Sequence, residues 1–253
     1  MQKILENCCL CPRKCNINRK NGRIGKCKAT NKIKIALYSI HRFEEPCISG
    51  EKGSGTVFFS NCNLNCVFCQ NYEISQLGNG KEITVERLAE IFLEQQQRNV
   101  ENINLVTPTS YVPQIIEALK IAKERGLKLP IVYNTNGYEN VETIKMLNGY
   151  VDIYLPDLKY SDNELAVRLS NAPKYFEIAT DAIGIMIRHL VLPNNIENSK
   201  KVLKWISEEL PKEVYVSVMA QYFPTYKAKD NVYGINRKLY NEEWKEIQRE
   251  ISN

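Results

Sequence analysis

Three cysteines lie close together in the stretch Cys62-Asn-Leu-Asn-Cys66-Val-Phe-Cys69. The stretch follows the short apolar run 56–59, which is typical of a strand, so we expect the cysteines to lie on a loop. Thiolates are soft ligands that favour iron–sulfur clusters or zinc. Three of them could hold three irons of a four-iron cluster and leave the fourth iron open to another ligand. A structural zinc loop is the alternative.

A second cysteine set, Cys8, Cys11, Cys15 and Cys27, lies near the N-terminus. Four thiolates at these short spacings can close a tetrahedral zinc site or a cluster. A structural metal, an auxiliary cluster and free thiols all remain open. Residues 1–30 show little apolar patterning, so a metal would have to hold this segment together. Cys47 belongs to neither set, and we expect it to be a buried small residue rather than a redox-active thiol.

The Cys-x3-Cys-x2-Cys motif after a strand, with Phe68 just before the last cysteine, resembles the signature of the radical S-adenosylmethionine (radical SAM) superfamily. The wider stretch from Glu45 to Ser75 resembles the PflX-type proteins, which are relatives of pyruvate formate-lyase activating enzymes, and the resemblance extends over nearly the whole chain. It implies a 4Fe-4S cluster bound by the three motif cysteines, S-adenosylmethionine on the open iron, and a cofactor-binding role for Phe68.

Further candidate residues follow the second and third predicted strands. Thr107-Pro-Thr109-Ser110-Tyr111 stands where radical SAM proteins place a Gly-Gly-Glu-like stretch that binds the methionine amino group, so the resemblance implies that Thr107 and Thr109 bind cofactor. PflX-type proteins have His where this chain has Ser110, and a simple Pro-containing turn is the alternative. Asn134 occupies the position of an Asp in the activating enzymes.

The fourth and fifth strands carry charged candidates. Asp157 and Lys159 match an Asp-x-Lys motif of the activating enzymes, where the Asp helps to hold a monovalent or divalent cation beside the S-adenosylmethionine carboxylate. A surface salt bridge is the alternative. Arg188 follows an Ile-Arg-Tyr segment of the same enzymes and could grip a carboxylate with its planar fork. His189 would face the opposite side of the strand and serve structure.

Strand and helix patterns alternate along the rest of the chain. The strands are predicted at 56–59, 103–106, 131–134, 151–155, 185–192 and 214–219, preceded by a strand at 32–40. Helices are predicted at 84–99, 113–126, 140–148, 163–183 (as short pieces), 199–210 and from Asn241, where Trp244, Ile247 and Ile251 should be buried. By pattern alone, a partial (βα)6 barrel and a doubly wound parallel sheet are equally consistent. The radical SAM resemblance selects the barrel.

We therefore predict an α/β chain with two parts: a Cys-rich N-terminal segment at 1–50 and a partial (βα)6 radical SAM barrel at 51–253. Ligands of parallel α/β folds bind at the C-terminal strand ends, which is where the cysteine loop falls. Gln221 and Tyr222 follow the last strand and are candidates to border adenine or substrate. The connection at 182–184 is shorter than the resemblance leads us to expect.

Composition is ordinary for a globular protein, with 43% hydrophobic and 25% charged residues. No apolar run is long enough for a membrane helix and no signal-peptide core precedes the first cysteines, so we expect a cytoplasmic protein without a membrane partner. The net charge of +5 is uneven, because residues 1–34 carry ten basic side chains and one acidic one. A solvated basic face near thiolates and a docking surface for an acidic partner are both consistent with this.

The expected activity is that of a radical SAM enzyme: reductive cleavage of S-adenosylmethionine to a 5′-deoxyadenosyl radical that abstracts a substrate hydrogen. A flavodoxin or ferredoxin would supply the electron, and a glycyl residue of a partner protein is one candidate substrate. Modification of a small molecule or of another protein is the alternative within this chemistry. A non-catalytic iron–sulfur or zinc protein and a nucleic-acid-binding module are alternatives outside it, although few aromatic residues lie near the basic segment to stack on bases.

Overall fold

The computed structural model describes residues 2–182, 186–212 and 214–252. The chain divides into two compact units. The first unit is made of residues 1–63, 73–135 and 139–154, and the second of residues 64–72, 136–138 and 155–253. The cysteine loop passes from the first unit to the second between Asn63 and Leu64. The predicted boundary at residue 50 stays a prediction.

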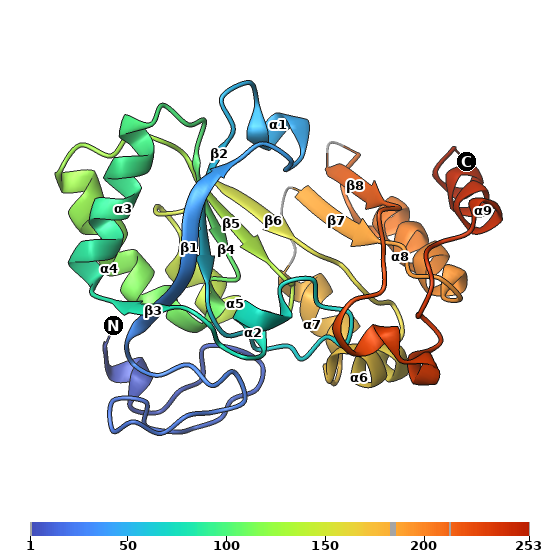
Figure 1. The fold of residues 1–253 in the computed structure, drawn as a ribbon, viewed down its shortest axis with the longest axis horizontal. Helices are drawn as coiled ribbons and strands as arrows, with labels where there is room; N and C mark the ends of the chain where they lie inside the picture. The colour runs from blue at the N-terminus through green and yellow to red at the C-terminus, as the bar shows by residue number, and fades with distance from the viewer. Residues whose placement is uncertain (1, 183–185, 213, 253) are drawn as a thin grey trace. The chain divides into compact units, whose positions relative to one another are not determined.

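A six-stranded sheet organises the first unit, and its last strand ends in the second (Figure 1). In spatial order the strands are β3 (Lys81–Ile83), β1 (Ile33–His41), β2 (Ser54–Phe59), β4 (Ile103–Val106), β5 (Ile131–Thr135) and β6 (Ile153–Pro156). Strands β2, β4 and β5 are mutually parallel, whereas β1 is antiparallel to both of its neighbours. The parallel strands are joined by helices, as this arrangement requires.

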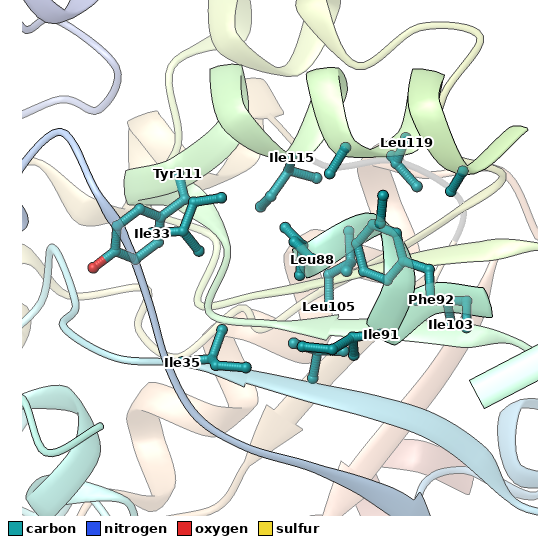
Figure 2. Packing of buried hydrophobic residues seen from close by; sticks show 14 of the residues in the cluster. Ile33, Ile35, Leu88, Ile91, Phe92, Ile103, Leu105, Tyr111, Ile115 and Leu119 are labelled. Carbon is teal, nitrogen blue, oxygen red and sulfur yellow. The ribbon is translucent and has the colours of Figure 1, made fainter. Parts of the chain in front are cut away.

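Helices α3 (Val85–Gln97) and α4 (Val112–Glu124) bury their apolar faces in one core with the sheet. Figure 2 shows Leu88 and Phe92 of α3 meeting Ile115 and Leu119 of α4 beside Leu105 of β4. These side chains are fully buried. Thr84 caps α3 by accepting a hydrogen bond from the backbone N–H of Arg87 at 3.1 Å.

The N-terminal segment contains one short 3-10 helix, Gln2–Leu5, and otherwise runs as turns and loops up to β1 (Figure 1). Its own apolar core is small, with Leu5, Cys8 and Leu10 buried and Ile4 and Ile17 packed against them. Three further short elements of the chain are α1 (Pro46–Ser49), α2 (Tyr72–Ser75) and α5 (Val141–Met146). A Cys-rich N-terminal region therefore precedes the sheet, as predicted.

The second unit holds a parallel pair of strands, β7 (Met186–Leu190) and β8 (Tyr215–Met219). Its helices are α6 (Asn163–Ser170), α7 (Tyr175–Ala182), α8 (Ile196–Glu209) and α9 (Asn241–Ser252), and two short 3-10 helices lie at Tyr226–Lys229 and Asn231–Tyr233. Just beyond β6, Asp157 forms an isolated parallel bridge with Arg188 of β7. This bridge connects the fourth predicted strand to the fifth.

The strand–helix alternation is confirmed, and the chain has the α/β architecture predicted for a partial (βα)6 radical SAM barrel. Helix α8 begins three residues before the predicted start, and β3 was not predicted. Two burial predictions are wrong: Ile251 is 49% exposed in the last turn of α9, and the Cys47 side chain is exposed. The short connection at 182–184 lies partly outside the described residues. No described helix is long and apolar enough to cross a membrane.

Candidate active site

The parallel strands of the first unit end together, because Phe58 of β2 is in register with Val106 of β4 and Val106 with Asn134 of β5. Cys62 follows the end of β2 by three residues, and Thr107 follows β4 directly. The backbone N–H of Thr107 donates to the carbonyl of Asn134 at 2.9 Å. The first unit therefore brings three predicted site residues to one edge of its sheet.

Thr107 carries backbone strain at this edge. Its φ of 58° lies in the left-handed region, which a β-branched side chain rarely adopts. Such strain costs about 1–3 kcal/mol and persists only where the surroundings enforce it. The hydrogen bond to Asn134 and the turn of Thr109–Tyr111 that follows supply that constraint.

Glu139 is a buried carboxyl group that the sequence analysis missed. Its Oε1 accepts hydrogen bonds from the hydroxyls of Thr109 at 2.5 Å and Thr135, and from that of Tyr133 at 3.4 Å. Its Oε2 is buried with no hydrogen-bond partner among the described residues. Burial raises the pKa of Glu139 to about 7, although the three hydroxyls oppose the shift. Thr109 therefore uses its hydroxyl to hold this carboxyl group.

In the second unit, Asp157 lies between two cations. Its Oδ2 is 2.5 Å from Nζ of Lys159, and its Oδ1 is 3.0 Å from both Nε and Nη2 of Arg188. About 15–17% of each side chain is exposed, so these are mostly buried ion pairs rather than the surface salt bridge considered above. The trio carries one net positive charge.

The electrostatics of this trio follow from burial and pairing. Burial alone would raise the pKa of Asp157, but the charges of Arg188 and Lys159 outweigh it and hold that pKa below its usual range. Burial likewise opposes the charged form of Lys159, and the carboxylate of Asp157 nevertheless raises its pKa. All three groups are therefore ionised at neutral pH.

Tyr175 of α7 fixes the backbone around the trio, and it was also missed. Its hydroxyl shares its single proton between the carbonyls of Asn136 at 2.8 Å and Asp157 at 2.7 Å, and it accepts a hydrogen bond from the backbone N–H of Lys159 at 3.1 Å. Gly137 adopts a φ of 77°, and a Cβ at this position would collide with the carbonyl of Asp157. Only glycine allows this close approach.

Cys66 is the motif cysteine whose surroundings are clearest. Its buried Sγ accepts a hydrogen bond from the hydroxyl of Ser170 at 3.0 Å. The loop is fixed on the end of α6, because the N–H groups of Asn65 and Val67 donate to the carbonyls of Ser170 and Leu169. Burial raises the pKa of the Cys66 thiol to about 11, and the nearby charge of Lys159 acts in the opposite direction.

Val67 and Phe68 are held by residues 222–228, where the backbone N–H of Ala228 donates to the carbonyl of Val67 at 2.9 Å. Thr225 donates its hydroxyl to the carbonyl of Phe68 at 3.0 Å, and the rings of Phe68 and Tyr222 meet edge to face with centroids 6.1 Å apart. Tyr222 is 3% exposed and donates its hydroxyl to the carbonyl of Ile235, whereas Gln221 is exposed. The second half of the cysteine loop is thus fixed from two directions.

His189 lies in the interior of the second unit. Its Nδ1 donates to the carbonyl of Leu158 at 2.6 Å, because a carbonyl can only accept, and its Nε2 therefore accepts from Ser199 of α8 at 2.9 Å. Burial lowers the pKa of His189 to about 4, so the ring is neutral at physiological pH. Neutral His189 therefore links β7 to α8 through a hydrogen bond, whereas its neighbour Arg188 forms an ion pair with Asp157.

The donor set fits an iron–sulfur cluster chemically. Three thiols are the ligands that a cluster with one open iron requires, and the second unit places a positively charged side chain near the buried Cys66. Within the described residues, no three Cys, His, Asp or Glu side chains are already gathered around one metal-sized position. The case for a cluster therefore rests on ligand type and spacing, together with the family evidence that follows.

Comparison with known proteins adds that evidence. An uncharacterized protein of Methanocaldococcus jannaschii is 36% identical over 96% of this chain and 73% of its own length. A pyruvate formate-lyase-activating enzyme of Clostridium pasteurianum is 28% identical over 67% of this chain and 75% of its own length. Both alignments span most of the relative's length.

A solved structure, Streptococcus suis SuiB bound to the precursor peptide SuiA, resembles this chain with a TM-score of 0.49 at 16% identity. The match covers 76% of this chain and 43% of SuiB, so this chain spans less than half of the length of that protein. Likeness at this level carries no argument about activity.

The family model described as the radical SAM superfamily matches residues 56–223. The match begins in β2 and ends after β8, and it includes the three motif cysteines, the Asp157 trio and every strand–helix unit between them. It covers well over half of the sequence, and the chain belongs to the radical SAM superfamily.

Proposed function

We propose that this protein is a radical SAM enzyme that uses Cys62, Cys66 and Cys69 to hold a 4Fe-4S cluster. Held by these three thiolates, such a cluster would supply the one electron needed for reductive cleavage of bound S-adenosylmethionine to methionine and a 5′-deoxyadenosyl radical. Abstraction of a hydrogen atom then gives 5′-deoxyadenosine and a substrate radical. The single observation that carries the proposal is the three-cysteine motif inside the region that matches the superfamily.

The residues around Cys66 have defined roles in this proposal. A buried thiol with a raised pKa resists ionisation, and the Lys159 charge together with the Ser170 hydrogen bond favours the thiolate that a cluster requires. Tyr175 and Gly137 hold the backbone of Asp157 in place. The loop is thereby organised before any ligand binds, which reduces the ordering cost of binding.

The Asp157 trio is proposed to receive the carboxylate of the methionine moiety. Arg188 and Lys159 carry two positive charges against the single negative charge of Asp157, so one positive charge remains for an anionic group. A metal cation beside Asp157 stays a prediction, since both carboxylate oxygens already have cationic partners. Cofactor contacts from Phe68, Thr107, Thr109 and Asn134 also stay predictions.

The substrate class is a finer proposal. Similarity to an activating enzyme over two thirds of the chain supports a glycyl residue of a partner protein as the hydrogen donor. A flavodoxin or ferredoxin remains the proposed electron source, and assignment to the PflX type remains a prediction. Modification of a small molecule or of another protein is the alternative.

The test is anaerobic reconstitution of the full chain with iron and sulfide, followed by incubation with S-adenosylmethionine and dithionite. We expect 5′-deoxyadenosine and methionine in equal amounts, detected by liquid chromatography and mass spectrometry. Cys66→Ser should abolish both products, whereas the matched change Cys47→Ser, at an exposed cysteine outside the motif, should leave them unchanged. A reconstituted wild type that produces no 5′-deoxyadenosine would contradict the proposal.

The glycyl hypothesis has a separate test. Turnover with a candidate partner protein grown on α-deuterated glycine should place deuterium in 5′-deoxyadenosine and produce a glycyl radical signal by electron paramagnetic resonance. Product formation without deuterium transfer from glycine would favour a different substrate and would leave the radical SAM chemistry intact.

A further inference from the structure

The N-terminal segment up to Lys28 carries five cysteines that the proposed activity does not use. Its apolar cluster consists of Leu5, Cys8 and Leu10 with Ile4 and Ile17 at the margin. So small an apolar cluster contributes little stability by itself, and small natural scaffolds often add a disulfide or a metal. The five cysteines of this segment are free thiols in the structure.

A buried cation lies inside this segment. Arg19 is 1% exposed, its Nε and Nη2 donate to the carbonyl of Thr30, and its Nη1 donates to the carbonyl of Ser110 at 2.8 Å. Its guanidinium also lies over the ring of Tyr111, 5.9 Å from the centroid. Every one of these partners is neutral, and no carboxylate among the described residues forms a salt bridge with Arg19.

Burying a charge without a counter-charge costs several kcal/mol, so Arg19 requires an anion. One contact can supply it, because Nη1 lies 3.9 Å from Sγ of the buried Cys8. As a metal ligand Cys8 would be a thiolate. Metal binding at Cys8 would therefore place an anion beside the Arg19 guanidinium.

Other cysteines of the same segment have contacts that bear on this point. Cys11 is partly buried, and it lies near enough to Cys8 and Cys27 to interact electrostatically with both. Cys15 packs against Gly25, where a Cβ would come within 2.7 Å of the Cys15 Sγ, so glycine makes room for that sulfur two residues before Cys27. Cys9, by contrast, donates its thiol to the Asn16 side chain at 2.9 Å.

We propose that Cys8, Cys11, Cys15 and Cys27 form a second metal centre, separate from the radical SAM cluster, in which Arg19 is the buried counter-charge to the thiolates. Four thiolates suit zinc or an iron–sulfur cluster. Either group carries net negative charge, which the excess of basic side chains in residues 1–34 also compensates. As with the motif cysteines, these side chains are not gathered at metal-bond distances, so the argument is one of charge and packing.

The N-terminal segment that carries this metal centre is hydrogen-bonded to other parts of the first unit. The guanidinium of Arg13 donates to the carbonyl of Asn63, directly after Cys62, at 2.9 Å. Thr143 donates its hydroxyl to the carbonyl of Leu10, and the Asn140 side-chain amide donates to the carbonyl of Cys9, both at 2.7 Å. The metal centre therefore braces the start of the radical SAM loop from within the first unit.

The test uses the full chain with Cys62, Cys66 and Cys69 all changed to serine, so that metal retained by this triple variant belongs to the second centre. It is purified after expression with zinc and, separately, after anaerobic reconstitution with iron and sulfide. We expect elemental analysis to find about one zinc per chain in the first preparation, or enough iron and sulfide for one cluster per chain in the second. Replacement by Co²⁺ should produce the charge-transfer absorption of a thiolate site.

Matched substitutions in the triple variant identify the ligands. Cys11→Ser should remove the metal, whereas Cys9→Ser, at the cysteine of the same segment that bonds to Asn16 instead, should leave the metal bound. Arg19→Met keeps the length of the side chain but not its charge. It should speed metal loss to a chelator about tenfold, with partial rescue by Arg19→Lys.

The proposal is overturned if the triple variant retains no metal, or if Cys9→Ser and Cys11→Ser behave alike. The wild-type chain provides a check should the triple variant fold poorly, because zinc in excess of the radical SAM iron is then counted directly and compared with Cys11→Ser. The outcome is independent of the proposed activity, which is tested by 5′-deoxyadenosine from the wild type.

Discussion

At the scale of single residues, buried charge distinguishes the two units. Asp157 in the second unit is satisfied by two cations, whereas Glu139 in the first has one oxygen held by three hydroxyls and one with no partner among the described residues. The first arrangement stabilises an ionised carboxylate and the second favours a protonated one. The arrangements around Asp157 and Glu139 can each be tested by a substitution that removes the charge of the carboxyl group.

Asp157→Asn should destabilise the protein by about 3 kcal/mol, because it leaves the mostly buried cations of Lys159 and Arg188 without a counter-charge. The shift would be measured as a lower urea midpoint at pH 7. Asp181→Asn removes an exposed carboxylate from α7 of the same unit and should change the midpoint little. Equal effects of the two substitutions would show that the Asp157 trio has no special role in stability.

Glu139 should make stability depend on pH. Its folded-state pKa of about 7 lies above its ordinary value of 4.5, so the folded state binds the proton more tightly. The contribution of Glu139 is fully present below pH 4.5 and is lost as pH rises through 7. Glu139→Gln should therefore reduce the loss of unfolding free energy between about pH 5 and pH 8 by about 2 kcal/mol.

The measurement is urea unfolding of both proteins at the two pH values. Glu142→Gln removes an exposed carboxylate from the neighbouring helix α5 and serves as the control, because its pH dependence should match the wild type. If Glu139→Gln retains the wild-type pH dependence, Glu139 does not titrate as its burial implies.

At the scale of elements, the helices are held by specific polar contacts as well as by packing. The clearest case is α9, where the carboxylate of Glu243 accepts from Arg237 at 2.7 and 2.9 Å and from the backbone N–H groups of Asn194 and Tyr240 at 2.8 Å. The same helix buries Ile247. One carboxylate thus ties the C-terminal helix to the segment between β7 and α8.

Glu243→Gln should loosen α9, observed as faster hydrogen exchange of Asn241–Ser252 at pH 7, while Glu250→Gln at an exposed position of the same helix should not. Arg237 chiefly lowers the pKa of Glu243 to about 2. Because this folded-state pKa is depressed, the stabilisation is present above about pH 4.5 and is lost as pH falls towards 2. Protection of α9 in the wild type should fall over that interval, and protection independent of pH would contradict this role.

At the scale of the whole molecule, the parallel strands supply the framework and the loops at their C-terminal ends carry the chemistry. Register across β2, β4 and β5 brings the start of the cysteine loop, Thr107 and Asn134 to one edge of the first unit. The second unit fixes Cys66 and the Asp157 trio through α6 and α7. The region that matches the radical SAM superfamily, residues 56–223, includes both sets of residues.

S-adenosylmethionine should stabilise the cluster-loaded protein by mass action. At a ligand concentration of about one hundred times Kd the gain is about 2.7 kcal/mol, which raises the Tm of a chain of this size by roughly 5 °C or more. Cys62→Ser, which removes one of the proposed cluster ligands, should show a much smaller shift under the same anaerobic conditions. An equal shift in both proteins would show that the ligand binds without the cluster.

The elements were predicted from sequence because their signals are local. Thr84, where a helix was predicted to begin, caps α3, and the buried stripe of α4 matches its spacing of apolar residues. The alternation of apolar and polar residues, together with the length of each apolar segment, distinguished strands from helices without tertiary information. The errors lie where the outcome depends on distant parts of the chain. Strand β3 forms by pairing with β1, and Ile251, in the last turn of α9, is half exposed although Ile247 on the same face is buried.

By itself the sequence determined the cysteine spacing, the superfamily resemblance and the order of strands and helices, because these depend on neighbouring residues. Only the tertiary structure decided that Asp157 is shared between Lys159 and Arg188, that Glu139 is buried among hydroxyls, and that Arg19 lies beside Cys8. The physical reason is that the energy of a charge depends on burial and on its partners, and both arise from segments that are distant in sequence.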